Sequence, residues 1–264
     1  MATAIVLFAL TGAVSGFLAG LLGIGGGIVL VPAFVWLFSY LEFDQVTVFQ
    51  QALATSMAVI LFTALSSVRA HHRRGSVDWT LAWRFAPGVL TGTLLGAFIA
   101  TRLSFTLLSL LFGVFLLLVA AQMVGGKVGT AAKPLPGPTG QGFVAVAIGF
   151  LSAMVAIGGG TMTVPYLAHH GVDVRRAVGT SAAVGLPIAL GGTFGYVATG
   201  LAQSSLPAAS LGYVYLPAML GTAVTAMLMA PVGAWAAHTL PVRQLKMAFA
   251  VLLVIVAVRL LSAG

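Results

Sequence analysis

The stretch from Gly20 to Pro32, which reads Gly-Leu-Leu-Gly-Ile-Gly-Gly-Gly-Ile-Val-Leu-Val-Pro, decides the fold of this chain. It lies inside a segment that is apolar from Ala4 to Phe38. Each glycine in a helix interior costs roughly 1 kcal/mol relative to alanine, so four glycines within five residues argue against a continuous helix. In hydrocarbon a broken helix is tolerated only where protein or a polar cavity receives the freed backbone groups. The stretch therefore predicts a helix break that marks a site.

The composition of the chain predicts a polytopic, all-α membrane protein. Of the 264 residues, 60% are hydrophobic and only 6% are charged. Apolar segments of about 20 residues with hardly a charge are typical of membrane-spanning helices. The absence of cysteine excludes disulfides, thiol nucleophiles and thiolate metal sites. The net charge of +8 comes from basic residues in short loops, where membrane orientation explains them better than nucleic-acid binding.

Hydrophobicity divides the chain into two groups of four segments. They cover residues 4–38, 46–68, 79–101 and 104–124, and then 142–168, 177–199, 212–236 and 245–262. The stretch between the groups is rich in Gly, Pro and Lys and has no apolar face, as is typical of an exposed linker. We therefore predict a first repeat at residues 1–124, a linker at residues 125–141 and a second repeat at residues 142–264.

Three motifs recur in the same order in both groups, which indicates an internal duplication. The matching pairs are residues 24–27 with 157–160, residues 31–32 with 164–165, and residues 52–56 with 177–181. The glycine-rich break is thus present twice. Secondary transporters often bind their substrates at such breaks in corresponding positions of two repeats.

Loop charges predict that the two halves are inverted relative to each other. The loop after the first glycine-rich segment carries Glu42 and Asp44, whereas its counterpart carries Arg175 and Arg176. Because positive loops tend to be cytoplasmic, equivalent loops are expected on opposite sides of the membrane. An inverted repeat requires the first segment of each half to be broken or re-entrant, entering and leaving on one side. Eight plain crossings are the alternative.

The doubled motif resembles a known transporter family. Residues 23–32 and 157–165, the Gly179-Thr180-Ser181 element and residues 72–79, His-Arg-Arg-Gly-Ser-Val-Asp-Trp, are similar to motifs of the TauE/SafE sulfite exporter family, also called the 4-toluene sulfonate uptake permease (TSUP) family. The resemblance covers nearly the whole chain. It implies a multi-pass permease of the bacterial inner membrane for small anions, typically sulfite or organosulfonates. The first half departs from the pattern by having Ala54 where the second has Gly179.

The breaks supply the chemistry expected of an anion site. Where a helix restarts, its first N–H groups have no intrahelical partner and the helix dipole makes that end positive. Glycines let an oxyanion approach the backbone, and neutral hydroxyls donate to it without a buried charge. A basic side chain could clamp it. The predicted substrate-binding residues are Gly25, Gly26, Gly27, Gly158, Gly159, Gly160, Thr161, Thr55, Ser56, Thr180, Ser181, Gln51 and Arg176.

Each of these residue types also has a purely structural interpretation. Glycines permit close helix packing, and for Gly88, Gly92 and Gly96, spaced by four, packing is the prediction. Thr and Ser hydroxyls in membrane helices often bond the carbonyl one turn back. A loop arginine is often only an orientation signal.

The positions of the few acids and the absence of an ATP-binding motif narrow the range of possible functions. Its acids, Glu42, Asp44, Asp78 and Asp173, all lie in predicted loops, which disfavours cation transport, and it has no Walker motif for ATP. We predict a secondary transporter of a small anion, with no catalytic residue, cofactor or metal. A carrier of another small organic acid is the alternative, and from other classes a membrane-embedded hydrolase or a scaffold subunit. A homodimer is the default assembly. Direction, coupling and substrate identity stay open.

Overall fold

The computed structural model describes residues 2–22, 26–125, 134–236 and 242–263, and these are helical apart from loops and one short hairpin. This confirms the all-α prediction. Five of the described helices are long and apolar enough to cross a membrane. The elements in chain order are α1 (Ala2–Leu22), α2 (Gly27–Tyr40), α3 (Val48–Arg73), α4 (Trp79–Ala100), α5 (Phe105–Gly125), α6 (Pro138–Met154), α7 (Gly160–His169), α8 (Val174–Gly200), β1 (Ser210–Leu211), β2 (Val214–Tyr215), α9 (Leu216–Ala236) and α10 (Val242–Ala263).

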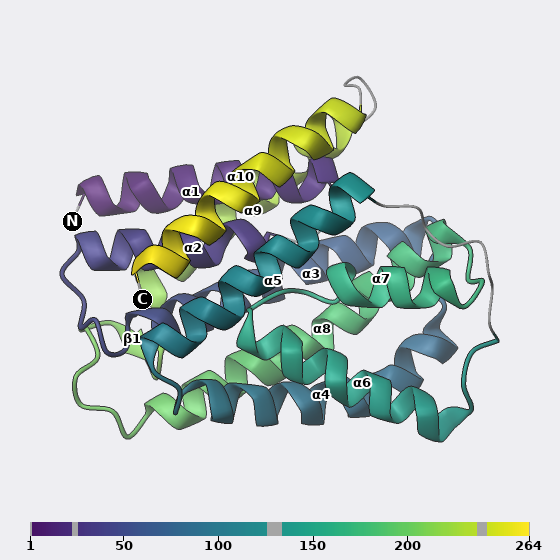
Figure 1. The fold of residues 1–264 in the computed structure, drawn as a ribbon, viewed down its shortest axis with the longest axis horizontal. Helices are drawn as coiled ribbons and strands as arrows, with labels where there is room; N and C mark the ends of the chain where they lie inside the picture. Colours follow the sequence, from purple (N-terminus) through teal and green to yellow (C-terminus); the bar gives the residue numbers. More distant parts are fainter. Residues whose placement is uncertain (1, 23–25, 126–133, 237–241, 264) are drawn as a thin grey trace.

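The helices run lengthwise beside one another, and both chain termini lie at one end of the bundle, called here the terminal end (Figure 1). The opposite end, called here the basic end, carries the last turn of α3 and the starts of α4 and α8 (Figure 1). It takes its name from Arg69, Arg73, Arg74, Arg84, Arg175 and Arg176. Since positive loops tend to be cytoplasmic, the basic end is expected to face the cytoplasm.

Both glycine-rich segments are broken, as predicted. In the first half α1 ends at Leu22 and α2 begins at Gly27; residues 23–25, which include the predicted site residue Gly25, lie outside the described residues. In the second half α6 ends at Met154 and α7 begins at Gly160. Figure 1 shows that α1 starts and α2 finishes at the terminal end, whereas α6 starts and α7 finishes at the basic end.

The backbone leaves the helical conformation at the second break. Ala156 has a φ of 44°, in the left-handed region that is strained for a residue with a Cβ. The Ile157 N–H then donates to the Ser152 carbonyl, 3.0 Å away, which closes the turn beyond α6. Strain of this kind is often retained at functional sites.

Two element boundaries differ from the predicted segments. Helix α6 begins at Pro138, inside the predicted linker, because proline suits the first helical position, where its missing N–H has no partner to lose. Helix α9 begins at Leu216 rather than near residue 212, because β1 and β2 first form a hairpin across Gly212, whose φ is 55°.

Small residues let helices of the two halves approach closely. A Cβ on Gly92 would overlap the Val146 carbonyl oxygen, and one on Gly88 would lie 2.7 Å from the Ala145 Cβ. The row Gly88, Gly92, Gly96 therefore packs α4 against α6, which confirms its predicted packing role. Helices α1 and α9 pack in the same manner through Gly12, Gly16 and Gly233.

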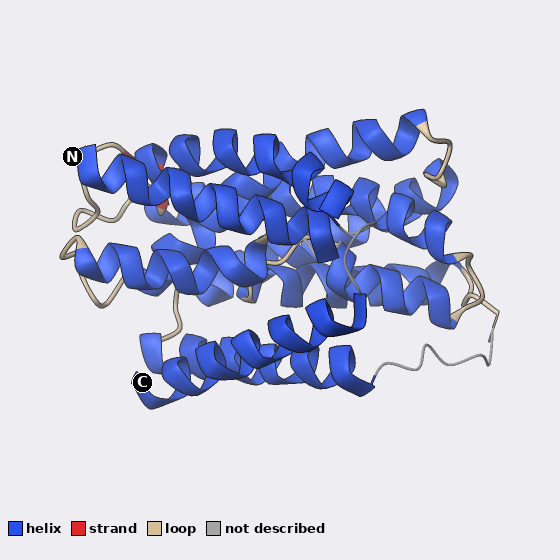
Figure 2. Cartoon of the chain, turned by 90° about the horizontal axis from the view of Figure 1, so that it is seen from above, coloured by secondary structure: helices blue, strands red, loops and turns tan. Residues whose placement is uncertain are grey.

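The packing partners follow a regular scheme around the central pair α3 and α8. Helix α1 packs on α9 as α6 packs on α4; α2 packs on α3 as α7 packs on α8; and α9 packs on α3 as α4 packs on α8. Helices α5 and α10 pair with each other along one side of the bundle (Figure 2). If helices α1 to α5 exchange places in order with helices α6 to α10, this set of helix pairs stays the same.

Candidate functional site

The two breaks meet inside the bundle. A side chain on Gly27, the first residue of α2, would overlap the Ala156 carbonyl oxygen of the second break. The same added Cβ would lie 2.9 Å from the Ile60 Cδ1 atom of α3. Ile60 also faces the second break, since a Cβ on Gly158 would lie 3.4 Å from its Cγ2. The structure therefore brings both predicted glycine motifs to one place, against α3.

The second break rests on α8 as closely. A Cβ on Gly159 would lie 2.8 Å from the Ser181 carbonyl oxygen and 3.1 Å from the Gly185 nitrogen. A Cβ on Gly26, by contrast, would meet nothing closer than 3.7 Å. For Gly27 and Gly159 the neighbouring space is thus filled by backbone, so their small size serves packing here. An anion-binding role for these glycines stays a prediction.

Near the breaks, three buried hydroxyls have no hydrogen-bond partner among the described residues. They are those of Ser56, Ser152 and Thr163, each with a fully buried side chain. Ser56 lies one helical turn before Ile60 on α3, and Ser152 is in the last turn of α6. Thr163 is in the first turn of α7, where its backbone N–H donates to the Gly159 carbonyl. Buried polar groups are nearly always paired, so three orphans near one place indicate a site for an acceptor.

The predicted residues Thr55 and Thr180 hold the two halves together. The Thr180 hydroxyl accepts a hydrogen bond of 3.0 Å from the Asp78 backbone N–H, at the start of α4. The Thr55 hydroxyl accepts one of 3.1 Å from the Tyr215 backbone N–H, at the start of α9. Each threonine is fully buried and pins a helix of the other half. A substrate contact of either hydroxyl stays a prediction.

Of the other predicted residues, Ser181 and Gln51 make hydrogen bonds within the protein. The Ser181 hydroxyl donates to the Val178 carbonyl, 2.8 Å away, which is the backbone bond common in membrane helices. The Gln51 Nε2 donates to Thr47 Oγ1 at 3.0 Å, while its buried Oε1 has no partner. Thr161 lies beside Gly160 in the first turn of α7 and is half-buried.

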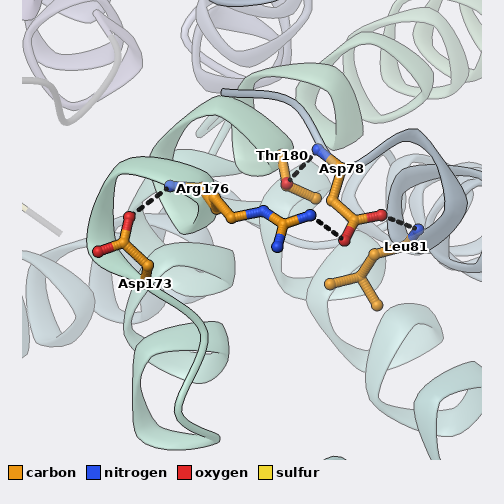
Figure 3. A network of polar contacts seen from close by, with 5 residues as sticks. All are labelled: Asp78, Leu81, Asp173, Arg176 and Thr180. Carbon is orange, nitrogen blue, oxygen red and sulfur yellow. Dashed lines mark hydrogen bonds and ion pairs between the residues drawn. The ribbon is translucent and has the colours of Figure 1, made fainter. Parts of the chain in front are cut away.

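Arg176 lies in the first turn of α8, at the basic end, with its side chain toward Asp78 (Figure 3). Its guanidinium donates to the Asp78 carboxylate at 3.3 Å, with side-chain exposures of 62% and 29% respectively. Asp78 also caps α4 by accepting from the Leu81 N–H, and Asp173 caps α8 by accepting from the Arg175 and Arg176 N–H groups. The Arg176–Asp78 ion pair and the hydrogen bond from the Asp78 N–H to Thr180 join the start of α4 to α8 (Figure 3).

Arg176→Gln is expected to change stability by less than about 1 kcal/mol, because exposed ion pairs contribute little and are screened by salt. The measurement is thermal unfolding in detergent at low and high salt, with Arg175→Gln for comparison, since Arg175 has no ion-pair partner among the described residues. A loss of several degrees in melting temperature that persists at high salt would contradict this expectation.

Comparison with known proteins identifies the family. The model of the family described as "Sulfite exporter TauE/SafE" matches residues 8–260. The chain belongs to the TauE/SafE family. A "probable membrane transporter protein" of Haemophilus influenzae is 35% identical over 262 residues, covering 98% of this chain and 99% of that one. Another of Methanocaldococcus jannaschii is 28% identical, covering 83% and 80% respectively. No solved structure gives a significant match.

As a TauE/SafE family member the protein is a multi-pass membrane transporter and not an enzyme. Within the described residues of this TauE/SafE chain, no three His, Asp or Glu side chains come together as metal ligands would.

Several residues that shape this TauE/SafE site are missed by the sequence reading. The Tyr196 hydroxyl is buried and donates to the Ala153 carbonyl at 2.8 Å, which fixes the end of α6 beside the break. Ser152 and Ile60 lie in plain apolar helices, and no sequence motif marks them. Asp78 had a usable signal, since an aspartate just before an apolar helical segment is a typical helix cap.

Proposed function

We propose that this transporter is a secondary carrier of a small anion, sulfite or an organosulfonate, in the bacterial inner membrane. The observation that carries the proposal is the group of orphan hydroxyls of Ser56, Ser152 and Thr163 around the meeting breaks. A sulfite or sulfonate group offers only acceptor oxygens, which suit neutral donors. Each orphan hydroxyl would then find in the substrate the partner that the protein does not give it.

The helix starts support an anion rather than a cation. Helices α2 and α7 both begin at the breaks without a capping side chain, so their N-terminal N–H groups and dipoles favour negative charge there. The acids lie in loops: Glu42 and Asp44 between α2 and α3, and Asp78 and Asp173 at the starts of α4 and α8. A carboxylate substrate meets the same donors, so another small organic acid is the alternative.

The packing scheme supports a duplicated, inverted architecture, with repeats at residues 1–124 and 142–264 joined by residues 125–141. The broken segments enter from opposite ends (Figure 1), and the three principal pairings α1–α9, α2–α3 and α3–α9 have the counterparts α6–α4, α7–α8 and α8–α4. In such carriers, alternating access results when the two repeats exchange conformations around a fixed central site. The breaks, which meet between the halves, are where such a site is expected.

The proposal predicts anion flux in proteoliposomes that contain only this protein. The purified chain should move sulfite or at least one sulfonate from a panel that also contains sulfate, lactate and potassium, while protein-free liposomes should not. The transported anion should also raise the melting temperature in detergent, because a ligand that binds only the folded state stabilises it. Flux of potassium alone, or absence of both flux and stabilisation for every anion, would refute the proposal.

We also propose a homodimer, because a two-fold dimer is the commonest closed assembly of identical chains. Native mass measurement of the protein in mild detergent tests it, and a monomer at all concentrations would exclude it.

A further inference from the structure

A large groove opens at the terminal end, and Ser56, Ser152 and Thr163 are not among its lining residues. It has a volume of about 1260 Å³ and lies between α2 on one side and the start of α5 and the end of α10 on the other. Sites for small molecules are typically roughly 300–1,000 Å³. The groove is therefore larger than an anion such as sulfite requires.

The groove has the length of one membrane leaflet. Along α2 its lining runs from Ile28 to Ser39. The eleven intervals between these residues, at about 1.5 Å each, give roughly 16 Å, close to half of the ~30 Å hydrocarbon thickness of a bilayer. The groove thus extends from the middle of the bundle, near the first break, to the terminal end.

The walls of the groove are apolar and belong to helices that do not pack tightly together. Val29, Pro32 and Trp36 line it from α2, and Leu252 and Ile255 line it from α10. Helix α10 packs chiefly on α5, and this pair runs along the side of the bundle (Figure 2). Trp36 is 63% exposed, although it lies on an apolar wall. Walls of this kind suit a hydrocarbon chain.

The mouth of the groove is positively charged. Arg102 and Arg259 both line it, and no Asp or Glu does. The Arg102 guanidinium lies 3.6 Å from the centre of the Phe98 ring, which leaves its edge available for hydrogen bonds. Within the described part of the chain the one ion pair is Arg176–Asp78, at the basic end. The loop acids Glu42 and Asp44 follow α2 but are not among the groove's lining residues.

A buried amide adds an acceptor to this charged mouth. Gln50 lines the groove and is 4% exposed; its Nε2 donates to the Leu103 carbonyl at 2.9 Å, but its Oε1 has no partner among the residues that the structure describes. An unpaired buried oxygen requires a donor such as a hydroxyl. The groove thus combines a leaflet-long apolar slot with two arginine side chains and one amide oxygen that have no ion-pair or hydrogen-bond partner in the described part of the chain.

We propose that this groove binds an anionic glycerophospholipid from the leaflet at the terminal end. An acyl chain lies between α2 and α10, the phosphate binds Arg102 and Arg259, and a headgroup hydroxyl donates to Gln50. The length and apolar walls favour a lipid over a free anion, and the two arginines favour an anionic headgroup over a zwitterionic one. The proposal is independent of which substrate the carrier moves.

The test is lipid binding by native mass spectrometry on detergent-stripped protein. Phosphatidylglycerol should bind on the order of tenfold more tightly than phosphatidylcholine of the same chains, and the preference should disappear in the double variant Arg102→Gln/Arg259→Gln. The matched control, Arg69→Gln/Arg73→Gln, removes two arginines from the basic end and should keep the preference. Ala33→Trp, which fills the groove wall, should weaken binding of both lipids.

Several outcomes would overturn the proposal. Equal affinity for the two lipids, or an equal loss in both double variants, would show that Arg102 and Arg259 do not recognise the lipid headgroup. Glycerol 1-phosphate binding as tightly as the lipid would indicate a free-anion site instead. A stable dimer that excludes lipid, and that Ala33→Trp dissociates, would assign the groove to a second copy of the chain.

Discussion

Gly27→Ala is expected to destabilise the protein strongly and to abolish transport. The added methyl group would overlap the Ala156 carbonyl oxygen and crowd Ile60, so the two breaks would have to move apart. Overpacking of a well-filled interior costs roughly 1–3 kcal/mol, and here the obstacle is backbone rather than a flexible side chain. For a chain of this size about 3 kcal/mol corresponds to a fall in melting temperature of about 6–12 °C. Thermal unfolding and anion flux measure the two effects.

The neighbouring glycine provides a matched control. At Gly26 an added Cβ meets nothing closer than 3.7 Å and the backbone φ is −70°, which any residue adopts. Gly26→Ala should therefore leave the melting temperature close to that of the unchanged protein, and a loss of flux without a loss of stability would indicate that the anion approaches the backbone at Gly26. Equal losses in the two variants would show that the glycine run acts through flexibility and not through the contact between the breaks.

The helices and their breaks were predictable because their signals are local. Runs of about 20 apolar residues and consecutive glycines act within one segment, so the broken first segment of each half follows from residues 23–27 and 157–160 alone. The start of α6 at Pro138 was misplaced because hydrophobicity begins later than the helix does. The proline in the first turn was the better signal.

The contacts of the predicted site residues were not predictable. Thr55 and Thr180 were recognised as hydroxyls inside apolar helices, yet their partners lie 160 and 102 residues away in sequence. Nothing in either helix indicates a backbone N–H at the start of a helix from the other half. A single sequence shows which hydrogen-bond donors and acceptors a segment carries. It does not show which other segment of the chain they contact.

Of the three orphan hydroxyls, that of Ser56 was among the predicted substrate contacts, whereas those of Ser152 and Thr163 were not. Ser152 and Thr163 look like ordinary small residues of membrane helices, whose hydroxyls usually bond the carbonyl one turn back. In the fold both are fully buried and lack that bond, whereas Ser181 makes it. Leaving a buried polar group unpaired costs about 1–3 kcal/mol, so these positions lower stability in the absence of a ligand. A binding site explains why this cost is kept, because the ligand pairs these hydroxyls when it binds.

Thr163→Val is therefore expected to raise stability and to weaken anion binding. Valine has nearly the shape of threonine, so the change removes the orphan hydroxyl without creating a cavity. The unliganded protein should gain about 1 kcal/mol, or about 2–4 °C in melting temperature. The loss of one hydrogen bond to a charged ligand, about 1.5–3 kcal/mol, should weaken affinity roughly ten- to a hundredfold. Isothermal titration with the transported anion and thermal unfolding measure the two changes on the same sample.

Thr180→Val is the matched control, since it makes the same chemical change on a hydroxyl that already has a partner. The variant leaves the Asp78 backbone N–H without its acceptor, so stability should fall by about 1–3 kcal/mol instead of rising. Opposite signs of the two stability changes are the result expected if Thr163 is held unpaired for a ligand. If Thr163→Val is stabilising but leaves anion affinity unchanged, the orphan hydroxyl belongs to no binding site. If it destabilises the protein as Thr180→Val does, its hydroxyl has a partner in the fold.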